Sequence, residues 1–401
     1  MDFDFEARHI IEALRSGIPS KIVGKCFCDS RSDLLKKIEK EMNSVVDTGL
    51  SNSRIISGRY GEGKTHMLNT VFNLASENNM VVSMISLSKE TPFNKLYLIY
   101  QKLMNNTYLP NRTQPGFIQE LERLTLNSKI TSDLLLFCHT VLDRDKLYYV
   151  LKSFVSTDNL DEKYLLQADL EGDVLANVTL KQIYKRIFRE RIKFNENFYK
   201  TRHFQDYFYF LSKLFKELGY NGWVILFDET ELVGRLGRKT RLNSYKNMAR
   251  FLFPEKKLDS TYSLFAITSS YAADVIDSKN EYEGIEKYFP ENPEPMKIVL
   301  ESIEAAEQLK PLSSKEIQEV LEKIISFHGK AYNWEPNVNV KEILKKSNSS
   351  GYLLRSKIRV AIEVLDNLYI YRDSGDVGIG DLESKKLDPD LPDLEQELED
   401  N

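Results

Sequence analysis

The apolar positions of this chain follow two different patterns along its length. Short continuous apolar runs, bounded by polar or glycine-containing segments, are typical of buried strands. Such runs occur at residues 54–57, 80–87, 223–227 and 262–267. Apolar residues at helical spacing occur at 5–15, 32–46, 242–253 and 313–371, the last range being broken by Pro336 and Gly351. Because strands alternate with helices, we predict an α/β protein whose parallel sheet is covered by helices on both faces.

A long helical stretch separates the second predicted strand from the third. Between Pro92 and Gly219, Leu, Ile, Phe and Tyr recur at helical spacing, and no convincing strand is found. A stretch of this length has the size of a small domain. The predicted parts are N-terminal helices with the first part of the core (1–91), a helical insertion (92–221), the second part of the core (222–311), a C-terminal helical lid (312–372) and an acidic disordered tail (373–401).

The overall composition is that of a globular protein from a reducing compartment. Of the 401 residues, 42% are hydrophobic and 29% are charged, which excludes wholesale disorder. Three cysteines do not make a disulfide framework. No run of 18 apolar residues is present to span a membrane. We therefore expect a cytoplasmic protein that does not enter a membrane.

The net charge of −5 averages two parts of opposite sign. Residues 373–401 contain eleven acids and two lysines, so the remaining 372 residues carry a net charge of +4. The acidity of the whole chain therefore does not argue against contact with nucleic acid. Two basic stretches could contact nucleic acid, with a solvated surface as the alternative for both: Arg235–Arg241 and Lys181–Lys193. The first could instead contact a partner or a neighbouring nucleotide.

A glycine-rich turn follows the first predicted strand. The segment Gly58-Arg59-Tyr60-Gly61-Glu62-Gly63-Lys64-Thr65 satisfies the pattern G-x-x-x-x-G-K-[ST], and His66 continues into the following helix. Glycines let the backbone approach phosphate oxygens, which the N–H groups and the helix N-terminus then bind. Lys64 would reach the β- and γ-phosphates of ATP, and Thr65 would supply a hydroxyl to Mg²⁺. The strand–turn–helix context favours a nucleotide site over a chance match.

Polar residues follow the third and fourth predicted strands. The apolar run at 223–227 ends at Asp228, which could hold Mg²⁺, and at Glu229, which could orient and deprotonate the attacking water. Thr268 and Ser269 follow the next strand, where a hydroxyl could contact the γ-phosphate, although Ser and Thr end many strands for other reasons.

The order of these motifs resembles an AAA+ ATPase of the origin-recognition/Cdc6-like kind. More specifically, the chain resembles the ATP-binding proteins of bacteriophage-exclusion (BREX) defence systems. The similar stretches are ARHIIEALRSGIPS (7–20), RYGEGKTHMLN (59–69), SLSKETPF (86–93), FDETELVGRLGRKTRLNSYKNMARFLFP (227–254) and YSLFAITSSY (262–271). The resemblance implies ATP-dependent antiphage defence beside subunits such as a helicase or a methyltransferase. It also implies nucleotide and metal roles for Lys64, Thr65, Asp228 and Glu229.

The last third of the chain resembles this family less obviously. Residues 351–355 are similar to the lid helix that presents the sensor-two arginine, so Arg355 is a candidate for reading the γ-phosphate, and a solvated arginine is the alternative. Residues 271–306, where a trans-acting arginine finger is expected, contain no arginine. The substitutes by composition are Arg235, Arg238, Arg241 and Arg250. Origin-recognition proteins usually carry a winged-helix DNA-binding domain after the lid, and in this sequence the acidic tail follows the lid instead.

Three functions stay open on this sequence. The first is a Mg-ATP hydrolase that acts as a conformational switch in a defence complex, on or near DNA. The second is a nucleotide-binding assembly module without turnover, which the missing finger supports. The third is an origin-recognition-like loader that binds DNA. Oligomerisation is compatible with all three.

Overall fold

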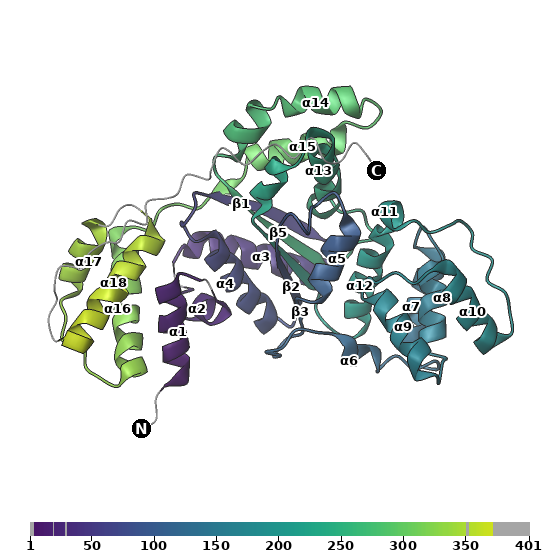
Figure 1. Cartoon of the computed structure of the whole chain (residues 1–401), viewed down its shortest axis with the longest axis horizontal. Coiled ribbons are helices and arrows are strands. Elements are labelled where there is room, and N and C mark those ends of the chain that lie inside the picture. The colour runs from purple at the N-terminus through teal and green to yellow at the C-terminus, as the bar shows by residue number, and fades with distance from the viewer. Residues whose placement is uncertain (1–3, 19, 29, 350–352, 372–401) are drawn as a thin grey trace. The chain divides into compact units, whose positions relative to one another are not determined.

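The computed structural model describes residues 4–18, 20–28, 30–349 and 353–371 of the chain (Figure 1). Its strands are β1 (Asn52–Gly58), β2 (Val81–Ser86), β3 (Thr107–Tyr108), β4 (Trp223–Asp228), β5 (Thr261–Thr268) and β6 (Glu307–Gln308). They form a six-stranded sheet in the order β3-β2-β4-β5-β1-β6. The pairs β1–β6, β2–β4 and β4–β5 are parallel, whereas β2–β3 is antiparallel. The predicted α/β class and mostly parallel sheet are confirmed.

Helices fill most of the remaining described chain. Those before β4 are α1 (Phe5–Ser16), α2 (Lys21–Cys26), α3 (Ser32–Thr48), α4 (Lys64–Glu77), α5 (Leu96–Met104), α6 (Ile118–Leu121), α7 (Lys129–Thr140), α8 (Lys146–Phe154), α9 (Leu160–Leu170), α10 (Asn177–Phe188), α11 (Lys200–His203) and α12 (Gln205–Glu217). Those after β4 are the 3₁₀-helix η1 (Thr230–Arg235), α13 (Arg238–Leu252), the π-helix η2 (Ala272–Asp277), α14 (Glu281–Tyr288), α15 (Glu294–Glu304), α16 (Ser314–Tyr332), α17 (Val340–Ser349) and α18 (Leu354–Tyr371).

The chain divides into two compact units, each considered by itself. Unit 1 consists of Met1–Lys36, Ile56–Asn73 and Glu307–Asn401, and unit 2 consists of Lys37–Ile55 and Leu74–Ala306. Among the described residues, no helix combines the length and the apolar composition that a membrane crossing requires.

The core of unit 1 joins the N-terminal helix to the C-terminal helices. The buried side of α1 contributes Ala7, Ile10, Ile11 and Leu14 at helical spacing, and these pack with buried aliphatic side chains of α16 and α18. Asp366 of α18 accepts hydrogen bonds from Arg15 of α1 (Nη2 at 2.6 Å) and lies 3.0 Å from Nε2 of His328 of α16. One carboxylate therefore links all three helices.

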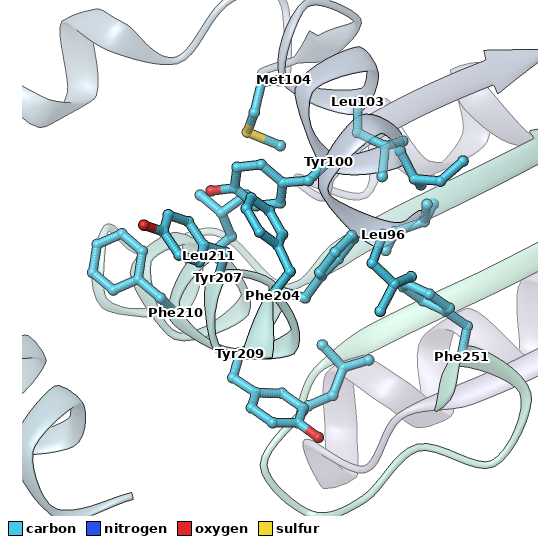
Figure 2. Close-up of a cluster of buried hydrophobic side chains, with 14 of the residues drawn as sticks. Leu96, Tyr100, Leu103, Met104, Phe204, Tyr207, Tyr209, Phe210, Leu211 and Phe251 are labelled. Atoms are coloured by element: carbon cyan, nitrogen blue, oxygen red, sulfur yellow. The ribbon is translucent and has the colours of Figure 1, made fainter. Parts of the chain in front are cut away.

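The core of unit 2 is rich in aromatic side chains. Figure 2 shows how α5 and α12 bring theirs together, and the stacked rings of Phe204 and Tyr207 have centroids 4.4 Å apart. All six residues of β4 are buried, as its continuous apolar run predicts. The Tyr100 hydroxyl donates to the carbonyl oxygen of Leu170 at 2.8 Å, which satisfies a polar group in an apolar core.

A buried ion pair joins α8 to α9. Lys146 Nζ lies 3.1 Å from Asp169 Oδ2, and the two side chains are 2% and 0% exposed. Asp169 also accepts hydrogen bonds from the Tyr207 hydroxyl and from the backbone N–H of Leu175, both at 2.6 Å. Burial raises the pKa of Asp169, and these partners oppose that rise. Each group of the pair therefore depends on the other for its stability in the interior.

Three expectations about the elements need correction or lie outside the described residues. The stretch between Pro92 and Gly219 does contain a strand, β3, but its two residues are too few to produce a hydrophobic period. Helix α13 begins at Arg238, four residues before the expected start. The apolar pattern missed this first turn because its residues are polar. The acidic tail and the break at Gly351 lie outside the described residues.

Candidate functional site

The glycine-rich turn lies between β1 and α4. β1 ends at Gly58 and α4 begins at Lys64, so the predicted strand–turn–helix is present. Gly61 has a φ of 80° and Gly63 a φ of 92°, which are values that residues with a Cβ rarely adopt. A turn of this kind presents backbone N–H groups to an anion, and the helix N-terminus adds its partial positive charge. The segment is chemically suited to a phosphate group.

Side chains of the turn bind the turn's own backbone. Lys64 is 8% exposed, and its Nζ donates to the carbonyl oxygen of Gly58 at 3.0 Å. The Glu62 carboxylate accepts from the backbone N–H of Arg59 at 2.8 Å. Thr65 is half-buried in the first turn of α4, whereas Tyr60 is 65% exposed. The lysine and the glutamate thus shape the turn that the sequence motif defines.

Arg31, which the sequence patterns do not single out, contacts the same turn. Its Nη2 donates to the carbonyl oxygen of Glu62 at 2.6 Å, and its Nε donates to the carbonyl oxygen of Lys310 at 3.1 Å. Its backbone N–H donates to Glu316 Oε1 at 3.3 Å, and Glu316 caps the N-terminus of α16. Because a trans peptide places its C=O and N–H on opposite sides, the Glu62–Gly63 peptide directs the Gly63 N–H away from Arg31.

The predicted lid arginine also lies beside the turn. Arg355, in the first turn of α18, donates from Nη1 to the Tyr60 hydroxyl at 3.3 Å and from Nη2 to the Ser16 carbonyl at 3.5 Å. A Cβ built on Gly61 would lie 3.7 Å from the side chain of Leu353. The start of the lid helix therefore lies against the tip of the glycine-rich turn.

His66 faces the N-terminal segment. Its Nε2 lies 3.0 Å from the carbonyl oxygen of Phe27, and burial lowers its pKa. At Gly24 of α2, an added Cβ would lie 2.8 Å from the backbone of Asn69. Thr70 Oγ1 donates to the Gly24 carbonyl at 3.2 Å. Helix α4 is thus packed closely on α2, and His66 takes part in that packing.

The predicted acid pair lies at the carboxyl end of β4 in unit 2. Asp228 is 4% exposed, and its Oδ1 accepts from the backbone N–H of Glu229 at 2.9 Å. Glu229 itself adopts a left-handed conformation, with φ 55° and ψ 34°. A non-glycine residue held in this region costs about 1–3 kcal/mol and is frequently found at functional sites.

The predicted sensor residues follow the neighbouring strand. β4 and β5 are parallel, and Phe227 is opposite Phe265, so both strands end at the same edge of the sheet. Thr268 is the last residue of β5, and its Oγ1 lies 3.5 Å from Ser270 Oγ, while Ser269 is half-buried in the turn that follows. The carboxyl edge of a parallel sheet is the usual position of a ligand site in this class.

Two of the candidate substitutes for an arginine finger are used inside unit 2. Arg241 forms a buried ion pair with Glu281, with Nη2 2.6 Å from Oε1 and exposures of 3% and 0%. Arg238 Nη2 donates to the carbonyl oxygen of Lys279 at 2.6 Å. Arg235, by contrast, is exposed on η1. Arg241 is therefore a structural residue that a neighbouring molecule cannot reach.

Comparison with known protein families adds a decisive match. The model of the family described as "BREX system ATP-binding protein BrxC/D" matches residues 4–126 and 184–373 of the chain. The chain belongs to this family. Membership makes it an ATP-binding component of a BREX defence system, and every candidate site residue lies inside the matched ranges. The BrxC/D model leaves out residues 127–183, which hold α7, α8, α9 and the start of α10. Neither the curated proteins nor the solved structures gave a match.

Proposed function

We propose that the protein is a Mg-dependent ATPase with an AAA+ P-loop core, which acts as a nucleotide-driven switch in a BREX antiphage complex on or near DNA. The observation that carries this proposal is the glycine-rich turn between β1 and α4. Its two left-handed glycines and its buried lysine supply the backbone donors and the charge that a triphosphate needs. Membership of an ATP-binding family supports ATP as the nucleotide.

Each residue of the site has a chemical role in this proposal. Lys64 binds the β- and γ-phosphates, while Thr65 and Asp228 supply hard oxygen ligands of the kind that Mg²⁺ prefers. Glu229 orients and deprotonates the attacking water, and Thr268 or Ser269 contacts the γ-phosphate. The buried position of Asp228 fits a metal ligand, because a carboxylate so poorly solvated gains strongly from a cation.

The lid would give the switch its readout. Arg355 and Arg31 both link the glycine-rich turn to the C-terminal helices of unit 1. In ATP-bound protein, Arg355 would bind the γ-phosphate in place of the Tyr60 hydroxyl. This would strengthen the attachment of the lid, because a hydrogen bond between two charged groups is stronger than one to a neutral hydroxyl. The lid would then respond to ATP more strongly than to ADP.

Two substitutions separate binding from turnover. Lys64→Ala should abolish nucleotide binding, whereas Glu229→Gln should keep ATP binding and stop hydrolysis. Binding is measured by calorimetry and turnover by phosphate release, with and without DNA and the neighbouring subunits. Hydrolysis by Glu229→Gln at the wild-type rate would remove Glu229 from the mechanism.

A nucleotide-binding assembly module without turnover is the second candidate. Residues 271–306 contain no arginine, and Arg238 and Arg241 are engaged inside unit 2. In a ring of subunits, neither Arg238 nor Arg241 would then be available to contact the nucleotide of a neighbouring subunit. If purified protein binds ATP but releases no phosphate under any of the conditions above, the assembly module is the better description. Pull-down in ATP and Mg²⁺ identifies its partners, for which a helicase or a methyltransferase subunit is expected.

A further inference from the structure

The exposed side of α10 carries only basic charge. Helix α10 and its two capping residues, from 176 to 189, contain no Asp or Glu, and the acids that flank this range along the chain are Asp173 and Glu190. We define the basic stripe as Lys181, Lys185 and Arg189, which lie four residues apart and are all exposed. This spacing places them on one face of the helix, opposite the buried side chains of Leu180, Ile183 and Tyr184.

The opposite side of α10 is firmly attached to unit 2. Lys152 of α8 donates to the Tyr184 hydroxyl at 3.1 Å, and its Nζ lies 4.7 Å from the centre of the Phe188 ring. In Figure 1, α10 is the outermost helix of the group that also contains α7, α8 and α9. The basic stripe is therefore carried on a helix whose position in unit 2 is fixed by these contacts.

Nearby acids do not neutralise the stripe. Glu162 of α9 is taken by Arg186, whose Nε lies 2.6 Å from Oε1. Among the residues that the structure describes, Lys185 and Arg189 form no ion pair, and Lys181 lies 5.1 Å from the centre of the Phe194 ring. The charge on this face is thus free to act on a partner.

Two features of the stripe oppose the stability of its own helix. Like charges four residues apart on a helix repel one another. Arg189 also occupies the C-cap of α10 with φ 58°, a left-handed position at which glycine is favoured. Lys185, in the last turn, interacts favourably with the helix dipole, whereas a glycine would suit position 189 better. Folding therefore accounts for Lys185 but not for a left-handed arginine at 189, for which a binding function gives a reason.

We propose that the basic stripe binds the phosphate backbone of duplex DNA. From Lys181 to Arg189 the helix advances about 12 Å, at 1.5 Å per residue. Duplex DNA carries one charge per about 1.7 Å of its axis, so regular phosphates are available to all three side chains. Two of the three side chains are lysines, which are point charges rather than base-reading forks, and contacts to phosphates carry no direct sequence information, so we expect binding independent of DNA sequence. The inference rests on the proposed action on or near DNA and names the surface that performs it.

The test compares two sets of substitutions that change the net charge equally. The stripe variant is Lys181→Gln/Lys185→Gln/Arg189→Gln. The control variant is Lys129→Gln/Lys256→Gln/Lys287→Gln, at exposed lysines elsewhere in unit 2. Binding to a labelled duplex of mixed sequence is followed by fluorescence anisotropy across a salt series. Loss of three phosphate contacts should make the slope of log affinity against log salt shallower by about 2.7. Between about 50 and 200 mM salt, wild type should lose about 40-fold more affinity than the stripe variant.

A single substitution separates binding from folding. Arg189→Gly removes one charge and relieves the left-handed arginine, so it should raise the Tm while it weakens DNA binding. A general loss of structure cannot produce that combination. Weaker binding together with a lower Tm would contradict the role given to Arg189.

The remaining outcomes each overturn part of the argument. Equal binding by the stripe variant and wild type, or equal weakening in the control, removes the stripe as the DNA surface. Absence of wild-type binding at low salt removes action on DNA, while ATP hydrolysis, if retained, leaves the switch standing. If DNA binds only after deletion of residues 373–401, with their eleven acids, the tail is the occupant of the stripe and the proposal fails.

Discussion

Replacement of Arg31 by alanine is the sharpest test of the contact between the glycine-rich turn and the lid. The substitution removes the donors to the carbonyl oxygens of Glu62 and Lys310 and leaves the backbone bond to Glu316 in place. The peptide group between Glu62 and Gly63 would then be free to rotate, because the Arg31 side chain would no longer hold the Glu62 carbonyl. The turn would spend less time in the conformation that binds phosphate.

The expected magnitude follows from the first of these bonds alone. The bond to Glu62 is short, at 2.6 Å, and a hydrogen bond to a charged group contributes about 1.5–3 kcal/mol. The bond to Lys310 does not involve the turn, so it should affect stability rather than binding. If the Glu62 bond is needed only for the binding-competent turn, Arg31→Ala should weaken ATP and ADP binding by about 10- to 150-fold. Arg31→Lys keeps the charge but cannot reach both carbonyls, so partial recovery is expected.

Calorimetric titration with ATP and with ADP measures this effect, well below the Tm of each variant. Lys36→Ala, at an exposed position of α3, is the matched control and should bind like wild type. A purely structural role for Arg31 would lower the Tm and leave affinity unchanged. Binding by folded Arg31→Ala within twofold of wild type would refute the argument that this side chain positions the turn.

Two further predictions concern buried charges of unit 2. Lys146→Met leaves Asp169 without its cation and should lower the free energy of unfolding by about 3–5 kcal/mol, whereas adding Asp169→Leu should restore most of it in urea unfolding. Burial raises the pKa of Asp206 to about 6, while its carboxylate accepts from the backbone N–H groups of Asp143 and Arg144. A raised carboxyl pKa stabilises the fold below that pKa, so this contribution should shrink by about 2 kcal/mol between roughly pH 4.5 and 7. Asp206→Asn should lack this pH-dependent contribution to the free energy of unfolding. If the free energies of unfolding of wild type and Asp206→Asn depend on pH in the same way, the contribution assigned to Asp206 is wrong.

The sequence predicted those parts of the fold whose signal is local. The apolar run of β4 stops at Asp228, and the structure places that carboxylate at the end of a fully buried strand. The two-residue strands β3 and β6 were missed, because a period cannot be read from two positions.

The parts of the candidate site that escaped prediction depend on distant contacts. Arg31 acts through Glu62 and Lys310, which lie 31 and 279 positions away, and its left-handed backbone has no sequence signature. Arg241 was a candidate for reaching a neighbour's nucleotide, but its partner Glu281 is 40 positions further along. Periodicity describes a residue's own segment and carries no information about which other segment will meet it.

The pairing of β2 with β4 has a consequence for how the protein is made. Their register partners Val81 and Trp223 are 142 positions apart, and loop closure over that length costs about 4–5 kcal/mol in chain entropy. At 5–20 residues per second, a ribosome needs roughly 7–28 s to deliver β4 after β2. During that interval the apolar strand β2 lacks its main partner, and an unpaired edge invites aggregation. The helices that separate the two strands along the chain can fold locally in the meantime, but β2 stays without β4 until the whole stretch has been made. Because slower synthesis of this stretch lengthens that exposure, it should reduce rather than improve the yield of soluble protein.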